Sequence, residues 1–188
     1  DTYALVGDDR EFYATLRVLF DKFTALRMMQ GRQASETFVF IGNHHYRKEQ
    51  LDSALHYYQQ ALIASTPGFH PKTVAENPSE EIIGFNYYVH TALSKKAAAF
   101  RKKFVVNNDP SCWSNSFESL RLAERLLSLE RNTLDMQDAQ WEFLDRNYDI
   151  YEDIISLLLD AGESLPQDTL YALAFQYFEQ SKSRTLAD

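Results

Sequence analysis

Apolar residues recur every three or four positions along most of the chain, and polar residues fill the positions between them. Residues 35–67 show this most clearly, because two such segments follow each other and close at Thr66 and Pro67. A period of three to four residues is typical of amphipathic helices, whereas a half-buried strand alternates every second residue. The pattern therefore predicts an all-α fold, with two helices in this stretch.

Small residues stand at Gly42, Ala54 and Ala61, with the large Tyr58 between the two alanines. Antiparallel helices can approach closely only where the facing side chains are small, and a large ring can fill the space beside them. The spacing from Gly42 to Ala61, followed by proline, resembles a tetratricopeptide repeat (TPR), which has a period of about 34 residues. One departure from that repeat is that Tyr46 lies one residue after the usual aromatic position.

The same small–large–small spacing returns twice, at Ser116, Leu120 and Ala123 and at Ala174, Phe178 and Ser181. We therefore expect one domain over residues 1–188, built as a TPR-like α-solenoid, which is a right-handed α-α superhelix. Its expected parts are an N-terminal helix or partial repeat (1–31) and three helical hairpins (33–67, 79–131 and 133–187). Each hairpin of such a stack buries its apolar faces only against its neighbours.

Capping signals indicate where the later helices begin and end. Ser79 followed by two glutamates is typical of a helix N-terminus, because serine caps the first turn and acids favour its positive end. That helix is expected to reach about Phe104, before a turn at residues 107–110. The first helix of the third hairpin is predicted over roughly 133–161 and is broken at Gly162.

The end of the chain carries a more specific resemblance. Residues 174–186 read A-F-Q-Y-F-E-Q-S-K-S-R-T-L, which is similar to the last helical unit before the caspase-like CHAT domain of TPR–CHAT proteins. The resemblance implies a cysteine peptidase domain downstream of residue 188. The catalytic His and Cys of that family belong to the downstream domain, so this chain is expected not to be an enzyme.

Composition narrows the class of protein further. With 45% hydrophobic and 24% charged residues, the chain is typical of a globular domain, and its 6 glycines and 5 prolines favour long helices. No apolar run reaches the roughly 18 residues that span a bilayer. The chain begins at Asp1 rather than Met, so we expect the natural N-terminus to lie upstream, and we expect a cytoplasmic location.

Charge is distributed unevenly along the chain, whose net charge is −8. Residues 130–188 hold 13 acidic and 4 basic side chains, whereas residues 1–129 hold 14 acidic and 15 basic ones. An acidic surface repels phosphate groups. Neither nucleic acid nor a membrane is therefore expected as a partner.

Two kinds of side chain suggest chemistry, but a packing role is expected for both. His44, His45 and His56 belong to one hairpin, yet adjacent histidines on a helix point about 100° apart and cannot face one ion. Cys112, the single cysteine, has no neighbouring histidine to act as its base. We expect no metal, no cofactor and no catalytic residue, and a helical enzyme built around the histidines stays as an alternative.

The concave face of the stack is the expected functional surface, because the first helix of each hairpin lines that face in this repeat class. The predicted groove residues are Glu36, Val39, Asn43, Tyr46 and Arg47, then Thr91, Arg101 and Lys102, and then Asp149, Glu152 and Ser156. Val39 stands where binders of C-terminal carboxylates carry lysine, which argues against a chaperone-tail clamp. A groove that is basic in its middle and acidic at its end favours a ligand of mixed charge, or could hold the downstream domain.

Five basic residues lie close together in the sequence of the second hairpin: Lys95, Lys96, Arg101, Lys102 and Lys103. They are expected to spread around a helix, mostly on a solvated face.

Two main interpretations of function follow. The first is a non-enzymatic interaction module that binds a protein or peptide partner, or that restrains its own downstream CHAT domain. The second is a purely structural or oligomerising helical-repeat scaffold with no peptide groove.

Overall fold

A computed structural model describes residues 12, 14–16, 18–19, 30–83, 87–132, 149–161 and 167–183. The elements assigned within these ranges are helices, and no strand occurs among them. The prediction of an all-α fold is confirmed for this part of the chain. None of the helices described is long and apolar enough to cross a membrane.

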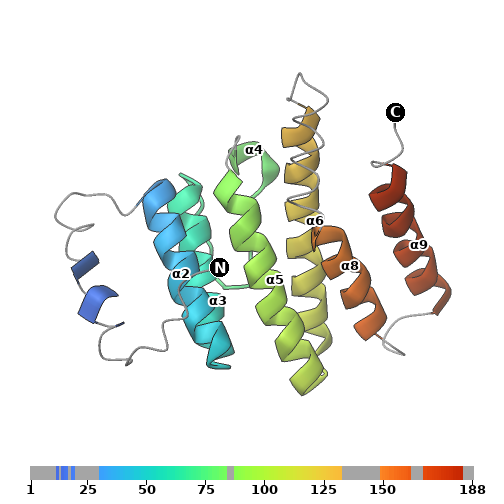
Figure 1. The fold of residues 1–188 in the computed structure, drawn as a ribbon, viewed down its shortest axis with the longest axis horizontal. Helices are drawn as coiled ribbons and strands as arrows, with labels where there is room; N and C mark the ends of the chain where they lie inside the picture. The colour runs from blue at the N-terminus through green and yellow to red at the C-terminus, as the bar shows by residue number, and fades with distance from the viewer. Residues whose placement is uncertain are drawn as a thin grey trace.

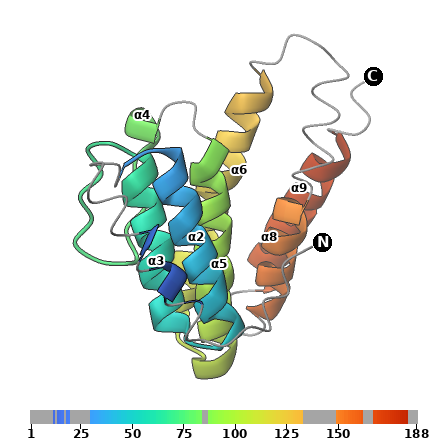
Figure 2. The ribbon, with the colours of Figure 1, turned by 60° about the vertical axis from the view of Figure 1, so that its left-hand side comes forward.

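The longer helices stand side by side in chain order (Figure 1). They are α2 (Arg32–Arg47), α3 (Leu51–Ser65), α5 (Tyr87–Asn107), α6 (Pro110–Asn132), α8 (Asp149–Asp160) and α9 (Gln167–Ser183), with the short α4 (Glu80–Ile83) before α5. Consecutive helices pair as hairpins, and neighbouring hairpins meet where α3 contacts α5 and α6 contacts α8. The first helices of the hairpins also meet, because α2 and α8 both contact α5; Figure 2 shows the row from another side.

The two helices of the first hairpin approach each other closely at Gly42. A Cβ atom at this position would lie 2.5 Å from Cε1 of Tyr58, so only glycine fits there. Tyr58 is 1% exposed, and its hydroxyl donates a hydrogen bond of 2.8 Å to Oδ1 of Asn43. The close approach that the spacing of small residues predicts is therefore present, and a large ring fills the space beside it.

A buried lysine holds the segment between α3 and α4. Lys96 is 0% exposed, and its Nζ donates to Oε1 of Gln59 at 2.7 Å, to the carbonyl of Glu76 at 2.7 Å and to Oδ1 of Asn77 at 2.8 Å. The three acceptors satisfy all three donors of the ammonium group. The expectation of a solvated face is wrong for Lys96, because the segment before α4 covers this side of α5 and supplies two of the acceptors, while Gln59 of α3 supplies the third.

Trp113 of α6 connects the second hairpin to the last one. Its indole Nε1 donates a hydrogen bond of 3.0 Å to the carbonyl of Leu157, in the last turn of α8, where carbonyls have no partner within the helix. The indole also stacks on Phe117, with ring centroids 5.2 Å apart, and Phe117 meets the edge of Tyr177 from α9. Trp113 thus anchors the packing of α6 against α8.

Several predicted boundaries can be compared directly. The short α4 begins at Glu80, as the Ser79 signal predicts, and α5 ends at Asn107, slightly beyond the expected Phe104. Residues 133–148 of the predicted first helix of the third hairpin lie outside the described residues, and α8 covers the rest of it.

The two ends of the chain can be compared only in part. Of the predicted N-terminal helix, residues 12, 14–16 and 18–19 are helical and residue 30 is not, and Leu16 is buried in the core. The final residues 184–188, which carry much of the CHAT-related resemblance, lie outside the described part.

Candidate binding groove

A cavity of about 440 Å³ opens between α5 and α8. Small and apolar side chains form much of its wall, and charged side chains from both helices stand around them. Its lining residues are Tyr46 from α2, Ala97, Ala98, Arg101, Lys102 and Val105 from α5, Ser116 and Leu120 from α6, and Asp153 and Asp160 from α8.

Three of the predicted groove residues meet at this cavity: Tyr46, Arg101 and Lys102. The Lys102 ammonium lies 5.4 Å from the centroid of the Tyr46 ring, which is within the range of a cation–π contact. Lys102 Nζ also donates to Oε1 of Glu49 at 2.9 Å, and this hydrogen bond raises the pKa of Lys102. Lys102 is therefore a positive charge at the α2 side of the cavity.

Arg101 joins α5 to the end of α8. Its Nε lies 2.5 Å from Oδ2 of Asp160, and both side chains are about one-third exposed. The pair connects residues that are far apart in sequence, and it links α8 to α5 on this side of the cavity. Because both groups are partly exposed, its contribution to stability is small.

Asp153 is a lining residue that the sequence prediction missed. Its side chain is half-buried. Burial raises the pKa of Asp153, the nearby Arg101 and Lys95 act in the opposite direction, and the carboxylates of Asp149 and Glu152 raise the pKa further. A carboxylate in this setting is less well solvated than one on an open helix face.

The predicted residues from α8 do not line the cavity. Asp149 and Glu152 are exposed, and Ser156 is half-buried. The face of α8 that does line it carries Asp153 and Asp160, which are seven residues apart and therefore lie above one another on the helix. The seven-residue spacing of Asp153 and Asp160 in the sequence could have identified this face of α8. The prediction instead chose the face that carries Glu152, which is one residue away along the helix.

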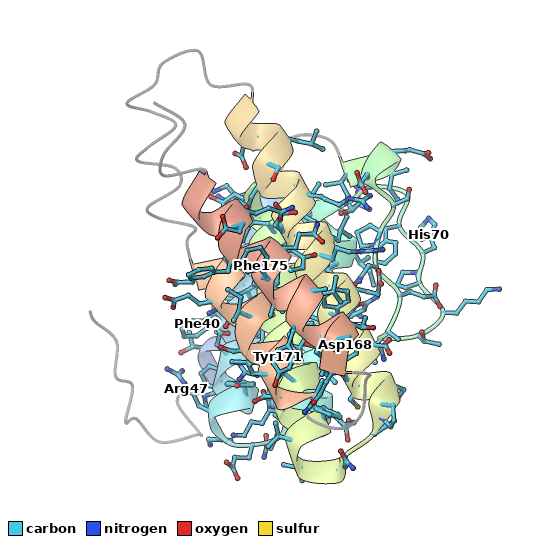
Figure 3. The ribbon with its side chains drawn as sticks, turned by 90° about the vertical axis from the view of Figure 1, so that its right-hand side faces the viewer. Phe40, Arg47, His70, Asp168, Tyr171 and Phe175 are labelled. Carbon is cyan, nitrogen blue, oxygen red and sulfur yellow. The ribbon has the colours of Figure 1, made fainter. Side chains whose placement is uncertain are left out.

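Four predicted residues from α2 lie outside the cavity. Glu36 is exposed and pairs with Arg32 at 3.1 Å, and Val39 packs against the core. Asn43 accepts the Tyr58 hydroxyl, as described above. Arg47 is exposed at the end of α2, on the same side of the molecule as Phe40 (Figure 3).

Thr91 also lies outside the cavity, although it belongs to α5. It is half-buried, and its hydroxyl lies 3.4 Å from Nε2 of His90.

Five further lining residues were absent from the prediction, and one of them is Val105 of α5. Ala97 and Ala98 make room for the cavity because their side chains are short, and Ser116 and Leu120 reach it from α6, the second helix of the hairpin. Ser116 donates a hydrogen bond of 2.9 Å to the carbonyl of Ala97. The prediction considered only the first helix of each hairpin, so it could not find cavity-lining residues on a second helix such as α6.

Two of the three histidines of the first hairpin, His44 and His45, take part in packing, whereas His56 is exposed. His44 stacks on Phe12 with ring centroids 3.7 Å apart, and His45 stacks on Tyr57 at 5.2 Å. His45 Nδ1 also lies 2.6 Å from Oε1 of Gln50. Among the residues that the structure describes, no group of three His, Cys, Asp or Glu side chains is placed to hold a metal ion.

Cys112 is buried, and its thiol lies 3.6 Å from Oδ2 of Asp109. Burial raises the pKa of Cys112, and the Asp109 carboxylate raises it further. A reactive cysteine needs the opposite environment, in which positive charge stabilises the thiolate. This environment is typical of a structural thiol.

Comparison of the chain with protein-family models, with curated proteins and with solved structures finds no match.

Proposed function

We propose that this chain is a helical-repeat interaction module, and that the cavity between α5 and α8 is part of a groove that binds a segment of a protein partner. The observation that carries this proposal is the meeting of Tyr46, Arg101 and Lys102 at one cavity, since all three were predicted to line a groove. Ligand sites are typically concave and largely apolar, with a few convergent polar groups. The alanines and the charged residues of this cavity have that character.

The charges around the cavity favour a ligand that carries both signs. The basic residues come from α5, and the acidic ones come from α8. Charge complementarity of this kind gives a groove selectivity for its partner more than raw affinity. A partner segment with neighbouring acidic and basic residues fits this arrangement better than a uniformly charged one.

The larger architecture that we propose is a TPR-like solenoid with a right-handed superhelical turn. The fit of Tyr58 beside Gly42 and the order of paired helices along the row support it. The resemblance of residues 174–186 to TPR–CHAT proteins supports a role as the arm of a larger protease-like protein. In that setting the groove would hold either a partner or the protein's own downstream domain.

Selection of peptides from a random display library on the 188-residue chain tests the groove. We expect enrichment on the wild-type chain and a loss of at least about tenfold in affinity on Ala98→Leu, because the added side chain fills the cavity. Ala172→Leu is the matched control, since Ala172 is exposed on α9. No enrichment on the wild-type chain, or equal binding by Ala98→Leu, would contradict the proposal.

A second candidate function, a structural or oligomerising scaffold, is favoured by one observation. Three aromatic residues of α9 are exposed, namely Tyr171 (62%), Phe175 (65%) and Phe178 (44%). Figure 3 looks onto this side of α9, with Tyr171 and Phe175 facing the viewer. Exposed aromatic patches often mark contacts with other proteins. Association of the chain that depends on concentration and is abolished by Phe175→Glu would support this candidate.

A further inference from the structure

Asp153 differs from the other charged residues around the cavity. Arg101 is paired with Asp160, and Lys102 is paired with Glu49. Asp153 has no hydrogen bond or ion pair with any residue in the part of the chain that the structure describes. It is therefore a half-buried carboxylate at the wall of a cavity whose nearest cations are already engaged or exposed.

Charged groups facing Asp153 do not remove the need for a counter-ion. Arg101 and Lys95 supply positive potential, but Arg101 bonds Asp160 and Lys95 is exposed. Asp149 and Glu152 supply negative potential from the same helix. A carboxylate that loses part of its hydration without gaining a partner is stabilised when a cation enters beside it.

The apolar wall of the cavity suits the aliphatic stem of an arginine or lysine side chain. Ala97, Ala98 and Val105 from α5 and Leu120 from α6 provide apolar wall beside the carboxylate. Arginine and lysine each have an apolar stem and a charged end, and they bury the stem along apolar surface while the charge finds a partner. The volume of about 440 Å³ leaves room for such a side chain together with part of its backbone.

We propose that this cavity receives an arginine or lysine side chain of the bound protein segment, with the Asp153 carboxylate as its ionic partner. The inference rests on the proposed groove function and specifies which ligand residue the groove selects. Arg101 and Lys102 leave the adjoining part of the groove positive, so an acidic residue next to the basic one suits the same site.

A small probe tests directly the basic-side-chain site beside Asp153, which we call the socket. The probe is N-acetyl-arginine amide, and its matched control is N-acetyl-citrulline amide, which has nearly the same shape without the charge. We expect the arginine probe to shift the methyl NMR signals of Ala98 and Val105 in the full chain, and the citrulline probe to bind at least about tenfold more weakly. Equal shifts with both probes would overturn the proposal.

Substitutions in α8 distinguish a specific role of the Asp153 carboxylate from a general effect of the negative charge on this helix. Asp153→Asn should lose at least about tenfold in affinity for the arginine probe, whereas Asp153→Glu, which keeps the charge, should retain a preference for arginine over citrulline. Glu152→Gln removes the same charge from the neighbouring exposed position and should leave binding nearly unchanged. Undiminished binding by Asp153→Asn, with an unaltered melting temperature, would overturn the proposal.

Peptide selection distinguishes failure of this inference from failure of the proposed function. If the wild-type chain enriches peptides that share a basic residue and Asp153→Asn does not, both stand. If it enriches peptides without a basic residue, or if Asp153→Asn enriches the same set, the groove function stands and the socket is wrong. If no peptide is enriched, the groove function itself fails.

Discussion

The first and last hairpins carry the same small–large–small spacing in their second helices, but only the first buries its large residue. Tyr58 of α3 is 1% exposed, whereas Phe178 of α9 is 44% exposed. Two further aromatic residues of α9, Tyr171 and Phe175, are more exposed still. The same sequence pattern therefore has two structural outcomes in one chain.

Neighbouring helices explain the difference. Tyr58 faces Gly42 on α2, and α3 lies between α2 and α5. In contrast, α9 stands at the end of the row of helices that the structure describes, and it packs against α8 (Figure 1). The sequence spacing shows where the large residue stands. Its burial also requires a small residue on the facing helix and a further helix on the other side of its own helix.

The largest effect is expected from Gly42→Ala. Alanine alone would favour the helix by about 1 kcal/mol over glycine, but its Cβ would lie 2.5 Å from the Tyr58 ring. Overpacking typically costs about 1–3 kcal/mol, and the upper end of this range applies here because the Tyr58 ring is held by its bond to Asn43. We expect a net loss of about 2 kcal/mol in the free energy of unfolding, measured by urea denaturation.

A double variant tests the cause of that loss. Gly42→Ala combined with Tyr58→Leu should lose less than the sum of the two single variants, because the smaller residue removes the clash. A Gly42→Ala chain as stable as wild type would show that the two helices can move apart without cost.

The next largest effect is expected from Lys96→Met, which removes the donor shared by Gln59, Glu76 and Asn77. Buried acceptors that lose a partner cost about 1–3 kcal/mol, so we expect a loss of about 2 kcal/mol near neutral pH. The loss should be local at first. Hydrogen exchange should therefore quicken in residues 68–78 before it does so in α2.

The same variant gives a pH dependence of known sign. Burial lowers the pKa of Lys96 from 10.5 to about 7 in the folded protein, and the Glu76 carboxylate acts in the opposite direction. Between these two pKa values the unfolded chain binds a proton that the folded chain does not, so wild-type stability rises with pH by up to about 1.4 kcal/mol per unit. Lys96→Met lacks this contribution.

Urea denaturation of both chains between pH 7 and 10.5 measures the effect. The stability of wild type relative to the variant should increase across this range. A constant difference would mean that the three acceptors keep Lys96 charged throughout, and a decreasing one would reverse the sign of its pKa shift.

The sequence predicted the helical class and the close approach of the first hairpin's helices at Gly42, because both depend on local spacing. It did not predict the burial of Lys96, because the acceptors lie 19, 20 and 37 residues away in the chain. Asp153 was missed for a similar reason. Which face of α8 meets the cavity depends on how that helix docks against its neighbours, and contacts such as that of Trp113 with Leu157 set this docking.

A smaller effect is expected from Trp113→Phe, which weakens the attachment of the last hairpin. Phenylalanine keeps a ring beside Phe117 but removes the donor to the Leu157 carbonyl. The loss of one such bond costs about 1 kcal/mol. We expect hydrogen exchange of α8 and α9 to rise by about fivefold while that of α2 and α3 is unchanged. Equal changes in both hairpins would show that the row unfolds as one unit.

The smallest effect is expected from Phe175→Ala on α9. The side chain is 65% exposed, and exposed substitutions usually change stability by less than about 0.5 kcal/mol. Phe38→Ala is the matched control, because Phe38 is 5% exposed and its loss from the core should cost about 3 kcal/mol or more. Urea denaturation at two protein concentrations separates the possible results. If Phe175→Ala costs more than about 1 kcal/mol, and does so only at the higher concentration, a second copy covers this face, which would favour the scaffold function over an uncovered end of the row.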